Sequence, residues 1–148
     1  MCDYSLQDIA SRPAKVGDEL VSTSFRDMLT HGFASPKEPA VAVCLMPGTE
    51  VAFAAAPVEY AGLLPFLPYR RIENRVARFR QVNLKYPTAH HDALEFPDGK
   101  VVLVTALKEG QRLTVLQLPA GAPVIDLQPH VHKDEAARVQ EAPVVPAR

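Results

Sequence analysis

The sequence predicts a mainly β domain, built as a small barrel or a strongly curled antiparallel meander sheet with one or two short helices. Fourteen prolines are spread over 148 residues, and each removes a backbone donor and disfavours helix just before it. Short apolar runs alternate with turn-forming residues, which is typical of strands. A chain of this length can bury about 70% of its unfolded surface. We therefore expect one compact domain over residues 1–119.

The first half of the chain contains three candidate strands, at residues 19–25, 40–46 and 49–55. Pro47 and Gly48 stand between the second and the third, and this dipeptide suits a tight turn. The second and third strands are therefore expected to form a hairpin.

The segment at residues 75–82 has two readings. Ala77 and Phe79 would lie on one face of a strand, whereas Val76, Phe79 and Val82 also fit helical spacing. We favour the strand, which follows an irregular proline-rich stretch.

A three-stranded meander is predicted for residues 93–96, 100–107 and 112–118. The residues at 97–99 and 109–110 supply turn chemistry for both corners. The second strand contains a continuous apolar run, which indicates burial on both faces, as in a curled sheet or small barrel.

The C-terminal residues 120–148 are rich in proline, alanine and charge, and we expect a tail there with a short helix over residues 133–141. The apolar stretches are far shorter than the roughly 20 residues of a membrane-spanning helix, so no membrane association is expected. Asp3 and Asp8 stand where a secretory signal would be basic and then apolar, which predicts a cytoplasmic protein. In that compartment Cys2 and Cys44 are expected to be thiols, with Cys44 inside a strand.

Several stretches carry a family resemblance: the opening MCDYSL, the segment VCLMPGTE at residues 43–50, RFRQ at 78–81 and HHDALEFPDG at 90–99. In these stretches the chain resembles an uncharacterised family of small bacterial proteins. The resemblance extends to about residue 119 and implies a bacterial, single-domain protein, without an activity, substrate or cofactor.

His90, His91 and Asp92 run directly into the first strand of the predicted meander. Adjacent side chains of an extended chain point to opposite faces, so both histidines can bind one metal only at a loop or bulge. Cys2 would offer a thiol and a free amine once the initiator methionine is removed. These four residues could hold a transition metal such as zinc. The alternatives are acid/base chemistry, or one solvated histidine and one that binds a neighbouring carbonyl.

Arginines are concentrated in residues 69–86, where Glu73 is the one acidic residue. The candidates for binding an anion or a partner are Arg70, Arg71, Arg75, Arg78 and Arg80. A solvated or salt-bridged face is the alternative. Nucleic acid is disfavoured because Phe79 is expected to point inward, tryptophan is absent and the net charge is only −1.

Two functional hypotheses follow. The glycines are scattered singly and no serine stands in a nucleophile elbow, so no complete catalytic signature is present. We therefore lean toward a non-enzymatic accessory or interaction protein that binds a larger protein partner or a second copy of itself. The alternative is a metal- or thiol-dependent protein with its site near Cys2, His90, His91 and Asp92.

Overall fold

A computed structural model describes residue 6 and residues 8–25, 30–64 and 66–120, and the fold is given for these residues. Its elements are β1 (Ser11–Pro13), β2 (Glu19–Phe25), β3 (Thr30–Ser35), β4 (Glu38–Cys44), β5 (Glu50–Phe53), β6 (Val58–Tyr60), β7 (Arg70–Ile72), β8 (Val76–Gln81), β9 (Asp92–Glu95), β10 (Val101–Leu103), a 3₁₀ turn at Val104–Ala106 and β11 (Arg112–Gln117). The prediction of a mainly β protein is confirmed. The tail and the helix predicted within it lie outside the described residues.

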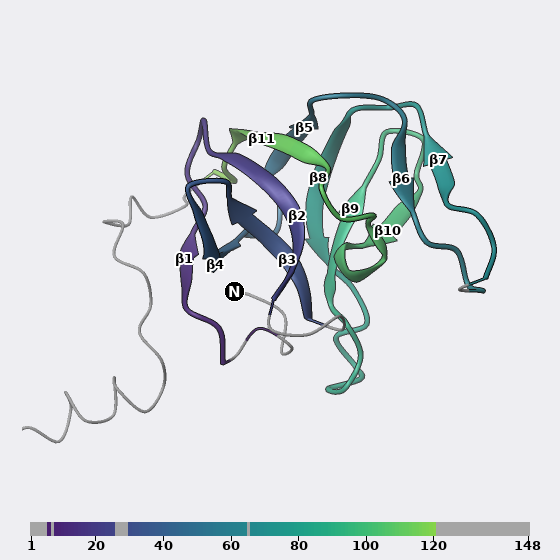
Figure 1. Cartoon of the computed structure of the whole chain (residues 1–148), viewed down its shortest axis with the longest axis horizontal. Helices are drawn as coiled ribbons and strands as arrows, with labels where there is room; N and C mark the ends of the chain where they lie inside the picture. Colours follow the sequence, from purple (N-terminus) through teal and green to yellow (C-terminus); the bar gives the residue numbers. More distant parts are fainter. Residues whose placement is uncertain (1–5, 7, 26–29, 65, 121–148) are drawn as a thin grey trace, which may run out of the picture.

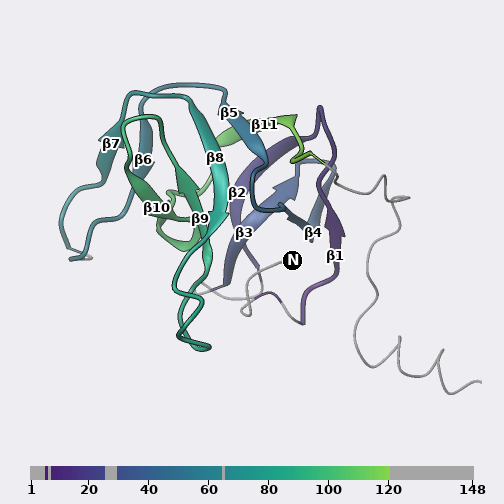
Figure 2. The ribbon, with the colours of Figure 1, turned by 180° about the vertical axis from the view of Figure 1, so that it is seen from behind.

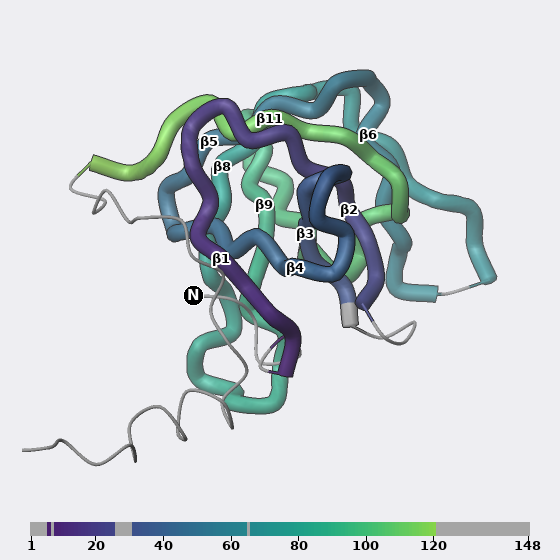
Figure 3. The backbone as a smooth tube through the Cα atoms, turned by 60° about the vertical axis from the view of Figure 1, so that its left-hand side comes forward, coloured from purple at the N-terminus to yellow at the C-terminus, as the bar shows by residue number. Residues whose placement is uncertain are grey.

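Nine strands form one mixed sheet in the order β1-β4-β3-β2-β11-β5-β8-β9-β10, and β6 pairs with β7 in a small second sheet. β1 runs parallel to β4, and the other described pairs are antiparallel. β1 and β10 are the two ends of the large sheet, so the described strands do not close into a barrel (Figure 1). Figure 3 shows β1 running alongside β4 at its end of the sheet.

The first predicted strand is confirmed as β2, but the hairpin predicted around Pro47 and Gly48 is wrong. β4 pairs with β3 and β1, whereas β5 pairs with β11 and β8. A shorter connection at Pro36 and Lys37 already joins β4 to β3. Gly48, at φ +96°, instead lies where the chain crosses from one part of the sheet to another, and its N–H donates to the carbonyl of Phe79 at 2.8 Å.

Only the first hairpin of the predicted meander forms. β9 and β10 pair with Val102 opposite Leu94, but the 3₁₀ turn ends β10 and β11 inserts between β2 and β5. β10 is thus the last strand of the sheet, and Val101 is 44% exposed while Val102 is 3% exposed. The expectation that this strand is covered on both faces is therefore wrong.

The main core collects inward side chains from both ends of the sheet. Leu20, Phe53, Leu94 and Leu113 are fully buried, and the rings of Phe53 and Phe96 stack with their centroids 6.3 Å apart. Strand β8 shows the expected alternation: Ala77 and Phe79 are buried, and Arg78 and Arg80, which alternate with them, are exposed. The strand interpretation of residues 75–82 is thereby confirmed.

Candidate interaction surface

The histidine pair lies just before β9. The N–H of Val82 donates to the carbonyl of His91 at 2.8 Å, and the Nδ1 of His91 lies 3.0 Å from the carbonyl oxygen of Val82. His91 thus extends the pairing of β8 and β9 by one residue, and its ring binds a backbone carbonyl. The carbonyl of His90 accepts a hydrogen bond from Asn83 at 3.3 Å.

Asp92 is the member of this run that turns inward, since it is 8% exposed and both histidines are half-buried. The described residues contain no group of three or more His, Cys, Asp or Glu side chains placed to hold a metal ion. Cys2 lies outside the described residues, so the four-residue metal site stays a prediction. Cys44 is disulfide-bonded, which overturns the expectation of a thiol at that position.

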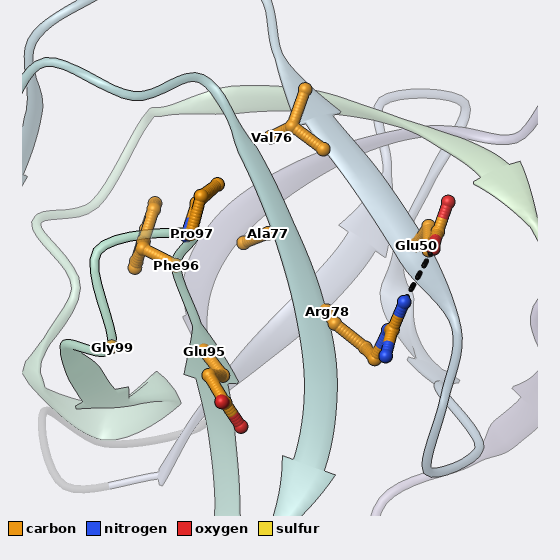
Figure 4. Close-up of a pocket in the computed structure, with 8 residues that line it drawn as sticks. All are labelled: Glu50, Val76, Ala77, Arg78, Glu95, Phe96, Pro97 and Gly99. Carbon is orange, nitrogen blue, oxygen red and sulfur yellow. Dashed lines mark hydrogen bonds and ion pairs between the residues drawn. The ribbon is translucent and has the colours of Figure 1, made fainter.

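The two arginines of β8 meet carboxylates from neighbouring strands. Arg78 donates from Nη2 to Oε1 of Glu50 on β5 at 2.9 Å, as Figure 4 shows. Arg80 donates from Nη1 to Oε2 of Glu95 on β9 at 2.5 Å. Because each guanidinium has a carboxylate partner, this row of charges is largely neutralised.

A shallow hollow of about 380 Å³ opens on this outer face, between the Glu50–Arg78 ion pair and the turn after β9. Its wall includes Val76, Pro97 and Gly99 (Figure 4). Glu50 and Arg78 on its rim bind each other, and Glu95 binds Arg80, so these charges offer little net field for a charged ligand.

Of the remaining three candidate arginines, Arg70 and Arg71 lie on β7 and Arg75 directly precedes β8. The Nε of Arg71 lies 3.6 Å from Oε1 of Glu59, and Arg75 donates to the carbonyl of Phe53 at 2.8 Å. The Nε of Arg70 lies 3.1 Å from the position that a Cβ on Gly62 would take, so this side chain lies over Gly62, close to the start of the loop that precedes β7.

That loop carries the most exposed apolar side chains of the described chain. We call residues 61–69, between β6 and β7, the apolar loop; Pro65 lies outside the described residues. Leu63 is 94% exposed and Phe66 is 79% exposed, and Leu64, Leu67 and Tyr69 are also exposed. The loop projects from the body of the molecule, away from β1 (Figures 1 and 2).

The base of the apolar loop is held to the main sheet by a polar cluster. Gln111 donates through Nε2 to the carbonyls of Glu59 and Lys108, at 2.8 and 3.0 Å. Lys108 Nζ binds Oε2 of Glu59 at 2.6 Å and lies 5.3 Å from the ring centroid of Tyr69. The hydrogen bond from Lys108 lowers the pKa of Glu59 below its ordinary value, against the opposing effect of desolvation. The loop is therefore presented from a fixed base.

Comparison with family models, with curated proteins and with solved structures finds no match to this chain. The resemblance to a bacterial family stays a prediction. Within the described residues, no helix has the length and apolar character needed to cross a membrane.

Sequence reasoning recognised the proline-rich stretch but did not identify its exposed apolar side chains. Leucines and a phenylalanine stand between prolines there, without the alternation that would place them on the inner face of a strand. Large apolar side chains between prolines, without strand alternation, were therefore the sequence signal for an exposed apolar loop. A second exposed apolar pair, Leu84 and Tyr86, lies in the separate connection between β8 and β9.

Proposed function

We propose that this protein is a non-enzymatic interaction protein that binds a larger protein partner through the apolar loop. The observation that carries the proposal is the exposure of Leu63 and Phe66 on a loop with a fixed base. Contiguous exposed apolar patches on globular proteins commonly mark interaction sites. An aromatic or aliphatic side chain that fills a pocket in a partner can anchor an interface.

The energy available from these two side chains supports specific binding. Moving one Leu or Phe side chain from water into an apolar pocket contributes about 2 kcal/mol. Leu63 and Phe66 together would then contribute about 4 kcal/mol, which corresponds to nearly a thousandfold in Kd. The fixed base reduces the ordering that binding requires.

A protein partner fits the surroundings of the loop better than a nucleic acid. Binding to a polyanion draws on cations that can neutralise phosphates. Arg71, Arg78 and Arg80 already face carboxylates of this chain, and the net charge is −1. The contribution left for partner binding is therefore mainly apolar.

The test compares the double variant Leu63→Ser/Phe66→Ser with the control Leu84→Ser/Tyr86→Ser, which removes another exposed apolar pair outside the apolar loop. A partner captured from cells that make the protein is purified, and its affinity for each variant is measured by calorimetry. We expect the loop variant to lose at least a hundredfold in affinity and the control to bind as the parent does. Equal affinities for the loop variant and the parent would refute the proposal.

Two further measurements test whether the apolar loop binds a membrane surface or a second copy of the chain instead of a larger protein partner. Sedimentation of the parent protein with anionic lipid vesicles, abolished in the loop variant, would assign the loop to a membrane surface instead. A concentration-dependent dimer that the loop variant cannot form would assign it to a second copy. Either result would overturn the assignment to a larger partner.

A further inference from the structure

The small sheet of β6 and β7 has one edge that is already occupied. In its antiparallel register Glu59 lies opposite Arg71. The N–H of Glu59 donates to Oε1 of Gln111 at 2.8 Å, and its carbonyl accepts from the N–H of Lys108 at 3.0 Å. Both backbone groups of Glu59 therefore point away from β7, toward the segment around residue 108.

This orientation determines where the backbone of Arg71 points. Directly opposed residues of an antiparallel pair either exchange both hydrogen bonds or point all four groups away from each other. Because Glu59 uses its groups on its other side, the N–H and carbonyl of Arg71 point outward, away from β6. The neighbours Arg70 and Ile72 belong to the pairs that bond to β6.

The outward edge of β7 has no strand beside it among the described residues. Among the described residues, no backbone hydrogen bond outside the strand pairings involves the N–H or the carbonyl of Arg71. These two outward groups lie at the middle of β7, directly after the apolar loop. An unpaired strand edge of this kind is a template for a further strand.

We infer that the edge of β7 receives an extended, acidic segment of a protein partner as a third strand of the small sheet. The inference rests on the proposed function, in which the adjoining apolar loop anchors that partner. Backbone hydrogen bonds to Arg71 would position the segment, as in other cases of strand addition. Arg70 and Arg71 are both exposed. Arg71 lies 3.6 Å from Glu59 on one side, but its guanidinium has five N–H donors, so a carboxylate opposite it on the added strand would form a further favourable cross-strand pair.

A second copy of the chain fits this edge less well. The register that would pair the whole of β7 with β7 of another copy places Arg71 opposite Arg71. Like charges directly opposite each other destabilise a strand pair. The charges thus favour an acidic segment from a different protein.

The test uses a blocked seven-residue peptide of alternating valine and glutamate as the probe, and the same peptide with lysine in place of glutamate as its control. Amide signals of the full chain are followed by NMR during each titration. We expect the acidic peptide to shift the amide of Arg71 and slow its hydrogen exchange, while the lysine peptide leaves both unchanged. Equal responses to the two peptides, or no response at millimolar peptide, would overturn the inference.

Two substitutions at one position separate the backbone contact from the charge. Arg71→Ala keeps the outward N–H and should weaken binding of the acidic peptide about two- to fivefold, the scale of one cross-strand pair. Arg71→Pro also removes the N–H, at an edge position where proline is tolerated, and should abolish binding. Equal binding by these two variants would show that no strand is added.

Hydrogen exchange of the parent protein provides a check that requires no variant. The amide of Arg71 should exchange freely in the absence of peptide, whereas those of Arg70 and Ile72 should be protected. Protection of Arg71 in the protein alone would overturn the inference. If Arg71→Pro binds the natural partner normally while the loop variant Leu63→Ser/Phe66→Ser does not, strand addition fails and the proposed function stands.

Discussion

Replacing Arg12 with alanine tests how strongly a buried ion pair holds β1 to the sheet. Arg12 donates from Nη1 to Oδ2 of Asp18 at 2.9 Å and from Nη2 to Oδ1 at 3.3 Å. Its Nε also lies 3.3 Å from Oε2 of Glu38. Burial disfavours the charge on Arg12, but its hydrogen bonds and charge interactions with Asp18 and Glu38 outweigh this effect and raise its pKa.

The expected loss is large because both members of the pair are buried. The side chains of Arg12 and Asp18 are 7% and 8% exposed. Removing one partner of a buried pair leaves an uncompensated charge and costs about 3 to 5 kcal/mol. With a urea m value of about 2 kcal/mol per molar, the midpoint of unfolding should fall by roughly 2 M.

The matched control is Arg78→Ala, which breaks an ion pair of the same type at the surface. Arg78 also lies 2.9 Å from its carboxylate, but its side chain is 64% exposed. Exposed pairs contribute at most about 1 kcal/mol, so the midpoint should shift by less than about 0.5 M. If the two variants lose the same stability in urea titrations followed by circular dichroism, burial does not decide the strength of these pairs.

Three further predictions concern the polar base of the loop, the chain crossing and the core. Lys108→Met should raise the pKa of Glu59 toward its ordinary value, measured by NMR titration of the carboxylate. Because the pKa of Glu59 is depressed in the folded protein, its contact with Lys108 stabilises the fold at pH values above the ordinary pKa of Glu59. This stabilisation is lost as the pH falls through the pKa of Glu59 in the folded protein. An unchanged pKa of Glu59 in the Lys108→Met variant would contradict the assignment. Gly48→Ala should cost about 1 to 2 kcal/mol in urea unfolding because φ is +96° and the added Cβ would lie 3.1 Å from that of Pro119; full stability would show that the turn can rearrange. Leu113→Ala should cost about 2 to 5 kcal/mol in the same assay, since Leu113 is fully buried, and a loss below about 1 kcal/mol would mean that the cavity collapses.

Local patterns predicted the features of this fold that depend on one strand at a time. The alternation in β8 placed Ala77 and Phe79 inward and its arginines outward because successive side chains of a strand face opposite sides. The residue content of 19–25 similarly predicted β2 with its observed bounds.

Strand partners were harder to predict because they depend on contacts between distant segments. β11 lies between β2 and β5, although the turn chemistry before it suggested pairing with β10. A hairpin turn permits a pairing without requiring it, and the 3₁₀ turn at Val104–Ala106 redirects the chain. The carboxylate partners of the arginines were missed for the same reason: Glu50 and Glu59 come from strands outside residues 69–86.

For the histidine run, alternation limited the side chains that can face inward but did not identify the inward residue. The inward residue is determined by the hydrogen bond between Val82 and His91, which fixes the register of this segment against β8. In this register the side chain of Asp92 faces inward. A shift of one residue would have exchanged the two faces. Which of these side chains could face a common metal ion therefore depends on the register between β8 and the segment that leads into β9. The spacing of the residues in the sequence does not reveal that register.

The pairing of the arginines changes the part they can play in binding a partner. Arginines without carboxylate partners would supply affinity for many acidic surfaces, whereas Arg78 and Arg80 are each engaged by a carboxylate of this chain. Breaking such a pair to form another exchanges one contact for a similar one, so it adds little net affinity. The apolar loop has no such competing contact for the nearly fully exposed Leu63. We therefore expect affinity to come from the apolar loop, and the arginines of β7 to select among partners that fit it.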